Sequence, residues 1–330
     1  MSSPSNSLET SESRIPDPGS RVIHLIGICG TAMATLAALL KRRGYDVRGS
    51  DQNVYPPMSD FLAAEDIPIV TGYAADHVGS DVDLVVVGNA ISRGNAELES
   101  ILERKIRYCS LPEAVRDHFL WGSRSIVVAG THGKTTTTSL TGWLLTHGRL
   151  DPTVLVGGIA LNFGDGGSSY RVGRGRDFVI EGDEYDSAFF DKTAKFLKYL
   201  PDVAVINNVE FDHADIYADF DAVTLAFRRL VTLVPRRGLL LIGADSPGAR
   251  ALAVGADEQQ PVLRDEIDQS AKRQRDGVEV RVDVRVIELD VVDDGDVRQV
   301  LQELRRLVEE GAVVFITFDD EVAPVADAVT

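Results

Sequence analysis

Short apolar runs and longer stretches with helical spacing alternate along the chain from about residue 21. Residues 22–26 form an apolar run that ends at a glycine-containing turn. Apolar residues then recur at helical spacing over 31–43, up to Gly44. A second strand is predicted to begin at 47–49 and to end at Ser50-Asp51, and an apolar run returns at 84–87. This β-α-β rhythm predicts a Rossmann-like domain from about residue 21 to residue 122.

A second series of the same kind begins at residue 125. An apolar strand is predicted at 125–129 and a helix at 136–146. Further strands are predicted at 178–180, 203–206 and 239–242. The alternation predicts a parallel sheet with helices on both faces, in a central domain that we expect to span 123–255.

The two ends of the chain differ from the rest. Residues 1–20 are rich in Ser, Pro and acids, which predicts a disordered tail. Residues 256–330 are an unassigned and divergent α/β segment. Residues 256–276 are polar. The pattern after them predicts a strand or hairpin at 278–292, a helix at 296–310 and a strand at 312–318.

Composition narrows the class of protein. No apolar run approaches the ~18 residues of a membrane span, and no signal-peptide pattern is present. The two cysteines, Cys29 and Cys109, suit a reducing cytoplasm and are expected to be small buried residues. The net charge of −17 disfavours nucleic acid and anionic membranes as partners. We therefore expect a cytoplasmic protein.

A glycine-rich loop at the start of the second series carries the strongest chemical signal. It reads Gly130-Thr131-His132-Gly133-Lys134-Thr135-Thr136. A loop of this kind between a strand and a helix presents backbone N–H groups and a helix dipole to phosphate. Lys134 is expected at the β- and γ-phosphates and Thr135 on Mg²⁺, although Val128 stands where the usual pattern has its first glycine. The fold class is therefore α/β, with a Rossmann-like domain followed by a P-loop ATPase-type parallel-sheet domain.

Two acidic segments follow predicted strands further along the chain. Residues 181–186 come after one strand and residues 207–215 after the next. Ligands sit at the carboxyl edge of open α/β sheets, and Mg²⁺ takes oxygen ligands there. The two segments are candidates to hold the metal of a phosphoryl transfer, and the alternative is a pair of solvated acidic loops.

The first glycine loop gives a weaker signal. Gly27 and Gly30 follow the first strand, but the third glycine of a dinucleotide fingerprint is missing. A nucleotide-diphosphate site remains plausible because the next helix points its N-terminus at the loop. Asp51 ends the second strand, where an acid commonly meets a ribose hydroxyl. The alternative is a tight turn and a surface acid.

Several longer strings resemble the Mur ligase family of peptidoglycan synthesis. The loop 130–136 and the string Asn208-Val209-Glu210-Phe211-Asp212-His213 have that family's form. The strings 49–59, 88–95 and 181–192 are most similar to the murein peptide ligase branch. The resemblance covers roughly residues 21–250.

The resemblance implies an ADP-forming amide ligase of peptidoglycan recycling. ATP would phosphorylate the lactyl carboxylate of UDP-N-acetylmuramate to give an acyl phosphate. The amine of the murein tripeptide L-Ala-γ-D-Glu-meso-diaminopimelate would then attack this intermediate. The implied partners are ATP, UDP-N-acetylmuramate and the tripeptide, with Mg²⁺ as cofactor.

The resemblance also implies roles for individual residues. The implied catalytic residues are Lys134, Glu181 and His213, and residues 130–136 would bind ATP. Thr135 and Glu181 would hold one Mg²⁺, and His213 a second. The UDP-sugar would meet Gly27, Gly30, Asp51, Asn89 and His132.

The chain departs from the family's pattern in its last part. The third domain of Mur ligases and the Asn that contacts adenine are not found, so we expect an incomplete central domain and no C-terminal domain. The alternative function is a catalytically incomplete Mur-ligase-like protein that binds only ATP or UDP-sugar. A dehydrogenase that uses the first glycine loop is a weaker alternative, because its fingerprint is incomplete and it would not need a phosphate loop.

Overall fold

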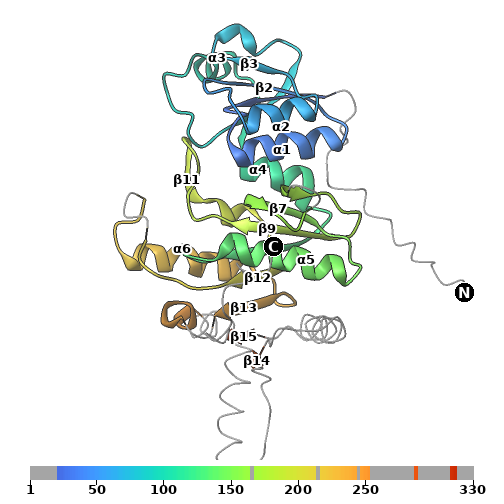
Figure 1. The fold of residues 1–330 in the computed structure, drawn as a ribbon. Helices are drawn as coiled ribbons and strands as arrows, with labels where there is room; N and C mark the ends of the chain where they lie inside the picture. Colours follow the sequence, from blue (N-terminus) through green and yellow to red (C-terminus); the bar gives the residue numbers. More distant parts are fainter. Residues whose placement is uncertain are drawn as a thin grey trace, which may run out of the picture.

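The computed structural model describes residues 21–163, 167–212, 216–243 and 246–252, with the backbone of two further strands at 286–288 and 313–317. The predicted tail at 1–20, the polar segment at 256–276 and the helix at 296–310 lie outside the described residues. Within the described residues, two α/β domains lie one above the other (Figure 1).

The N-terminal domain contains a five-stranded parallel sheet in the order β3-β2-β1-β4-β5. Its strands are β1 (Val22–Ile26), β2 (Asp46–Asp51), β3 (Ile69–Thr71), β4 (Val82–Val87) and β5 (Tyr108–Ser110). Its helices are α1 (Thr31–Arg42), α2 (Met58–Ala64) and α3 (Ala96–Arg104), with a short 3₁₀ turn η1 at Ala75–His77. The predicted Rossmann-like sheet is confirmed, and its strand order reverses between β1 and β4.

The central domain is built on an eight-stranded sheet in the order β14-β15-β13-β12-β6-β9-β7-β8. Its strands are β6 (Arg124–Ala129), β7 (Thr153–Ala160), β8 (Ser168–Arg171), β9 (Asp177–Gly182), β12 (Val203–Ile206), β13 (Leu239–Gly243), β14 (Val286–Glu288) and β15 (Val313–Thr317). All its pairings are parallel except that between β7 and β8. The predicted last strand is confirmed as β15. Of the segment predicted as a strand or hairpin at 278–292, the described part, β14, pairs in parallel with β15.

Helices cover both faces of the central sheet, as predicted. Successive side chains of β6 point to opposite faces of the sheet. Ile126 and Val128 pack in the cluster that includes Leu145 of α5 (Lys134–His147). Val127 and Ala129 pack in the opposite cluster, which includes residues of α6 (Phe220–Leu233). Because neighbouring side chains of a strand point to opposite faces, α5 and α6 lie on different sides of the sheet.

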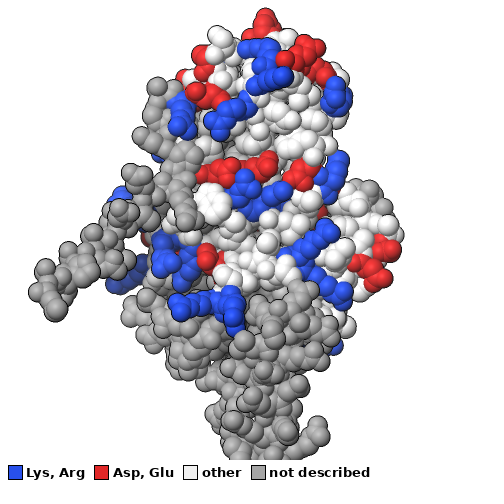
Figure 2. Space-filling view, turned by 180° about the vertical axis from the view of Figure 1, so that it is seen from behind, with Lys and Arg blue, Asp and Glu red and all other residues white. Residues whose placement is uncertain are grey.

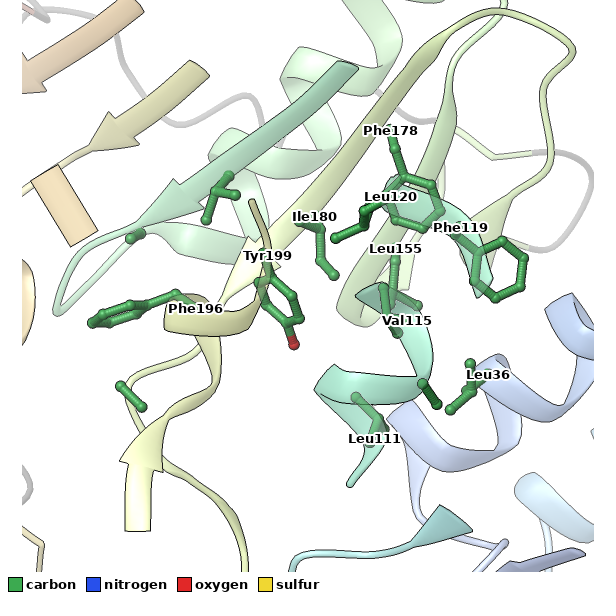
Figure 3. Packing of buried hydrophobic residues seen from close by; sticks show 14 of the residues in the cluster. Leu36, Leu111, Val115, Phe119, Leu120, Leu155, Phe178, Ile180, Phe196 and Tyr199 are labelled. Carbon is green, nitrogen blue, oxygen red and sulfur yellow. The ribbon is translucent and has the colours of Figure 1, made fainter. Parts of the chain in front are cut away.

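A short helical segment wedges between the two sheets. It consists of α4 (Leu111–Val115) and the single π-helical turn η2 (Arg116–Leu120). Side chains of this segment share one buried cluster with Leu36 of α1 and with Phe178 of β9 (Figure 3). The rings of Phe119 and Phe178 lie 5.9 Å apart between centroids. The hydrophobic core is therefore continuous across the domain boundary.

Polar contacts reinforce this junction at the edge strand β8. The hydroxyl oxygens of Thr35 in α1 and Ser169 in β8 are 2.6 Å apart. The Tyr170 hydroxyl donates a hydrogen bond of 2.8 Å to Glu65, which also forms an ion pair with Arg42. The antiparallel strand β8, which the sequence pattern did not predict, thus connects the central sheet to α1 and α2.

A two-stranded extension of the central domain also reaches the N-terminal domain. It consists of β10 (Asp186–Ala188) and β11 (Asp191–Ala194), followed by the 3₁₀ turn η3 (Lys195–Lys198). Figure 1 shows β11 running toward the upper domain. Phe190 at its tip packs edge-on against Tyr108 of β5, with ring centroids 5.2 Å apart. This extension begins directly after the acidic segment 181–186.

The negative charge of the chain is unevenly distributed. Residues 256–330 contain 20 Asp and Glu against nine Lys and Arg, so they carry 11 of the 17 net negative charges. On the face shown in Figure 2, Lys and Arg groups spread over both described domains with Asp and Glu between them. The net charge of −17 therefore does not make the two described domains strongly repulsive to anions. Among the described residues, no helix is both long and apolar enough to cross a bilayer.

His118 in the wedge segment gives the fold a testable pH dependence. Burial lowers the pKa of His118 from about 6.5 to about 4, and its Nδ1 lies 2.8 Å from the Tyr45 hydroxyl. Since the unfolded chain binds this proton more readily, stability falls as the pH drops from about 6.5 to about 4, by at most about 3 kcal/mol. We expect His118→Gln to flatten the unfolding free energy over this range, measured by urea denaturation. The exposed His147→Gln is the control, and an equal effect of both variants would contradict the assignment.

Candidate active site

Three neighbouring strands end together at one edge of the central sheet. β6 lies between β9 and β12, and Ala129 at its end pairs with Gly182 and with Ile206. Because all three strands are parallel, the segments that follow them meet at the same edge. The phosphate loop, the acidic segment 181–186 and the segment after β12 are thereby brought together, as the sequence predicts.

The phosphate loop depends on glycine at two positions. Gly130 has φ +140° and Gly133 has φ +75°, in the region that side chains disfavour. A Cβ atom on Gly130 would lie 3.1 Å from Cβ of Asn207 and 3.2 Å from the backbone nitrogen of Asn208. The loop therefore packs directly on the residues after β12, and a side chain at position 130 would crowd them.

Two asparagines after β12 fasten the loop. The Asn208 carbonyl accepts from the N–H of Thr131 at 3.1 Å, and its side-chain oxygen accepts from the N–H of His132 at 2.8 Å. The Asn207 amide donates to the His132 carbonyl at 3.2 Å and to Thr137 Oγ1 at 3.0 Å. These contacts explain an Asn-Asn pair directly after an apolar strand, to which sequence reasoning assigned no role.

Thr131 and His132 thus hold the loop in place, while the start of α5 stays open. Thr131 is buried, and its hydroxyl accepts from the N–H of Glu210 at 2.9 Å. Gly133 caps α5 without a side-chain acceptor, and the first turn contains no acidic residue. Since the first N–H groups of a helix lack intrahelical partners, the amides from Gly133 to Thr136 are the natural donors to a phosphate.

Lys134 lies at the centre of the site. Its ammonium donates to the carbonyls of Gly130 at 2.9 Å and Thr131 at 3.2 Å. It also forms an ion pair with the buried carboxylate of Glu184, with both oxygens within 3.0 Å. Sequence reasoning placed Glu184 in an acidic segment but gave it no role, because nothing in the spacing shows which carboxylate turns toward the loop.

Thr135 and Glu181 form the predicted pair of oxygen ligands. Thr135 Oγ1 donates to Glu181 Oε1 at 3.1 Å, and the N–H of Gly157 holds the other carboxylate oxygen at 2.8 Å. Two adjacent ligands of an octahedral Mg²⁺ at 2.0–2.1 Å lie about 2.9 Å apart. The pair therefore fits a magnesium ion that would replace the hydrogen bond between them.

The rest of the predicted metal site is untested. His213 lies outside the described residues. Within the residues that are described, no group of three or more His, Cys, Asp and Glu side chains gathers as a metal site would. The second Mg²⁺ at His213 stays a prediction.

The N-terminal domain presents a second loop-to-helix junction at its switch point. Gly27 has φ +82°, and its N–H and that of Ile28 donate to the Ser50 carbonyl at 2.8 and 3.1 Å. Helix α1 begins after Gly30 with no side-chain cap and no acid in its first turn. Asn89 is exposed after β4, on the other side of the strand-order reversal. Gly27, Gly30 and Asn89 therefore flank the place where open α/β sheets bind ligands.

Asp51 also has a structural role in this junction, which sequence reasoning did not assign to it. It is 8% exposed, and its carboxylate accepts from the N–H groups of Cys29 and Asn53, each at 2.9 Å. The carboxylate thus ties the first glycine loop to the end of β2. Both carboxylate oxygens already accept backbone hydrogen bonds. Contact of Asp51 with a ribose stays a prediction.

A buried polar cluster beneath this loop was missed by sequence reasoning. Glu97 of α3 is fully buried and accepts from the Ser50 hydroxyl at 2.5 Å. Its carboxylate also contacts His24 and His77 at 3.1 and 2.7 Å. Burial acts to raise the pKa of Glu97, but hydrogen bonds from His24 and Ser50 lower it overall. The cluster fixes Ser50, whose carbonyl in turn holds Gly27.

Comparison with known families matches both parts of this arrangement. A profile described as the Mur ligase family, catalytic domain, matches residues 22–120. A profile described as the Mur ligase middle domain matches residues 128–297, more than half of the chain. The chain belongs to the Mur ligase family. The second match extends beyond residue 255, and the domain boundaries predicted above remain predictions.

Individual relatives in this family are named as ligases of UDP-N-acetylmuramate. The UDP-N-acetylmuramate–L-alanyl-γ-D-glutamyl-meso-2,6-diaminoheptandioate ligases of Haemophilus influenzae and Escherichia coli are 45% and 41% identical over 73% and 76% of this chain. The chain spans about half the length of these relatives, 53% and 54%. The crystal structure of the corresponding ligase from Neisseria meningitides has a TM-score of 0.67 and 41% identity, covering 71% of this chain and 74% of that one.

Gly130 offers a direct test of the loop geometry. We expect Gly130→Ala to lower the unfolding free energy by about 2–4 kcal/mol, because it adds both a left-handed strain and a close contact. Gly72→Ala is the control: its φ is +83° but nothing lies within 4 Å of the added atom, so we expect about 1 kcal/mol. Chemical denaturation measures both, and equal losses would show that Gly130 is not crowded by β12.

Proposed function

We propose that this Mur ligase family member is an ATP-dependent amide ligase that joins UDP-N-acetylmuramate to the murein tripeptide L-Ala-γ-D-Glu-meso-diaminopimelate. The observation that carries the proposal is the open start of α5, with Lys134 and the Thr135–Glu181 pair at the same sheet edge. The names of the relatives support the choice of substrates.

The reaction needs what this site offers. A carboxylate is a poor electrophile, so ATP first phosphorylates the lactyl carboxylate of the sugar nucleotide. The resulting acyl phosphate is attacked by the tripeptide amine, which forms the amide and releases phosphate. Lys134 and the amides of the first turn of α5 stabilise the negative charge of the transferred phosphoryl group.

Magnesium fits this site through its oxygen donors. Thr135 and Glu181 would hold one ion, and His213 a second. When bound, the metal neutralises charge on the β- and γ-phosphates. Gly157 keeps the Glu181 carboxylate turned toward Thr135 through its N–H.

The sugar nucleotide is assigned to the N-terminal domain. The uncapped start of α1 suits the diphosphate, with Gly27, Gly30 and Asn89 around it. Asp51 acts at least by holding the backbone of this loop. His132 is 60% exposed in its side chain at the tip of the phosphate loop, where it can meet the sugar.

The decisive experiment measures ADP release with UDP-N-acetylmuramate and tripeptide together. We expect ADP release to require both substrates.

The affinity for MgATP tests the phosphate loop itself. We expect Lys134→Ala to lower it by about 10- to 100-fold, since a charge-assisted hydrogen bond is removed. Calorimetry measures the affinity. Binding of ATP or UDP-sugar without turnover would favour the alternative, a binding protein without ligase activity. Equal ATP affinity in wild type and variant would refute the site itself.

A second prediction concerns the metal. We expect Glu181→Gln to weaken ATP binding about tenfold in the presence of Mg²⁺, because a neutral amide is a poorer ligand than a carboxylate. In excess EDTA the two proteins should bind ATP alike. A loss of the same size with and without Mg²⁺ would place Glu181 outside the metal site. Calorimetry in the two buffers separates these outcomes.

A further inference from the structure

A buried ion pair lies directly behind the phosphate loop. The Lys134 side chain is 14% exposed and that of Glu184 only 3%. The ammonium nitrogen is 3.0 Å from Oε1 and 2.9 Å from Oε2 of Glu184, so the carboxylate faces it with both oxygens. The Lys134 ammonium, which is expected to contact the phosphates of ATP, is therefore already paired with the Glu184 carboxylate.

The donors of Lys134 are fully engaged in this arrangement. An ammonium has three N–H groups, and Lys134 has acceptors at Gly130, Thr131 and Glu184. A phosphate oxygen can bind the ammonium only by replacing or sharing one of these acceptors. Glu184 provides the one negatively charged acceptor of the three, so its attraction for the ammonium is the one that most opposes the exchange.

The backbone at Glu184 is held from several sides. The carbonyl of Glu184 accepts from the Tyr217 hydroxyl at 2.9 Å. The chain is fixed on one side by Glu181 at the end of β9 and on the other by β10, beyond which Phe189 packs against the N-terminal core. The backbone that carries the carboxylate is therefore fixed close to the phosphate loop.

We propose that Glu184 competes with the nucleotide triphosphate for Lys134 and thereby sets the affinity of the site for ATP. The proposal rests on the assignment of the phosphate loop made above. Glu184 holds the ammonium at the loop while the site is empty and gives up part of its contact when ATP binds. It is a positioning residue that acts through Lys134.

This role predicts effects of opposite sign on the empty protein and on ATP binding. Glu184→Gln keeps the shape of the side chain but removes its charge. We expect the nucleotide-free variant to unfold at a lower temperature, because a buried ammonium loses its counter-ion. We expect it to bind MgATP on the order of tenfold more tightly, because the competing charge is gone. A residue needed only for folding would weaken both.

A double-mutant cycle separates competition from simple repulsion. MgATP affinity is measured by calorimetry for the full chain, Lys134→Met, Glu184→Gln and the double variant. If Glu184 acts through Lys134, its substitution tightens binding more in the presence of Lys134 than in the methionine background. Glu210→Gln is the control for losing one exposed charge near the loop, and we expect a change of at most about twofold.

Each result of this cycle has one meaning. If Lys134→Met binds ATP as the wild type does, the phosphate-loop assignment fails. If that variant loses affinity but folded Glu184→Gln binds ATP no more tightly than wild type, only the role of Glu184 is overturned. Should Glu184→Gln not fold, Glu184→Ala leaves space for water at the ammonium and carries the same expectation of tighter binding. Failure of both variants to fold would assign Glu184 to the fold alone and overturn the proposal.

Discussion

The parallel pairing of β9, β6 and β12 is the constraint on which the rest of the site depends. Three strands that end at one edge bring together segments that are about 50 to 75 residues apart in the chain, such as Lys134 with Glu184 and His132 with Asn207. None of these segments could form the site alone. The phosphate loop takes its shape from the two asparagines after β12, and the carboxylates that contact its lysine and threonine come from the end of β9 and the residues just after it.

The same edge is connected to the N-terminal domain by hydrophobic packing. The wedge of α4 and η2 fills the space between the sheets, and one buried cluster runs from Leu36 to Phe178 (Figure 3). On another side, the β10–β11 extension carries Phe190 onto Tyr108. Because this extension starts beside Glu184, the segment that contacts Lys134 is also the segment that touches the N-terminal domain. The two proposed substrate sites therefore share a continuous physical connection.

Much of the fold could be predicted from the sequence because buried parallel strands are apolar runs and phosphate loops need glycines. The β-α-β series, the helix after Gly133 and the helices on both faces follow from those patterns. Strand β8, the η2 turn and β10–β11 could not, since their residues are mixed in character and acquire their role only from contacts across the domain boundary. The polar cluster at Glu97 was hidden for the same reason: Ser50, His24 and His77 come from three separate segments.

The site shows a similar division between residue type and residue contact. Residue types named Lys134 and Thr135, because a phosphate loop and its metal demand those types, and the resemblance to the Mur ligase family named Glu181. The sequence could not show that the backbone N–H groups of Thr131 and His132 donate to Asn208. Nor could it show that the Asp51 carboxylate accepts from the backbone of the first glycine loop. Residue type and spacing alone could not distinguish Glu181 from Glu184, which share a segment but face different partners. One carboxylate lies beside the threonine hydroxyl, where it suits a metal, whereas the other neutralises the lysine. In the two roles proposed above, these glutamates, three residues apart, would act on ATP binding in opposite directions.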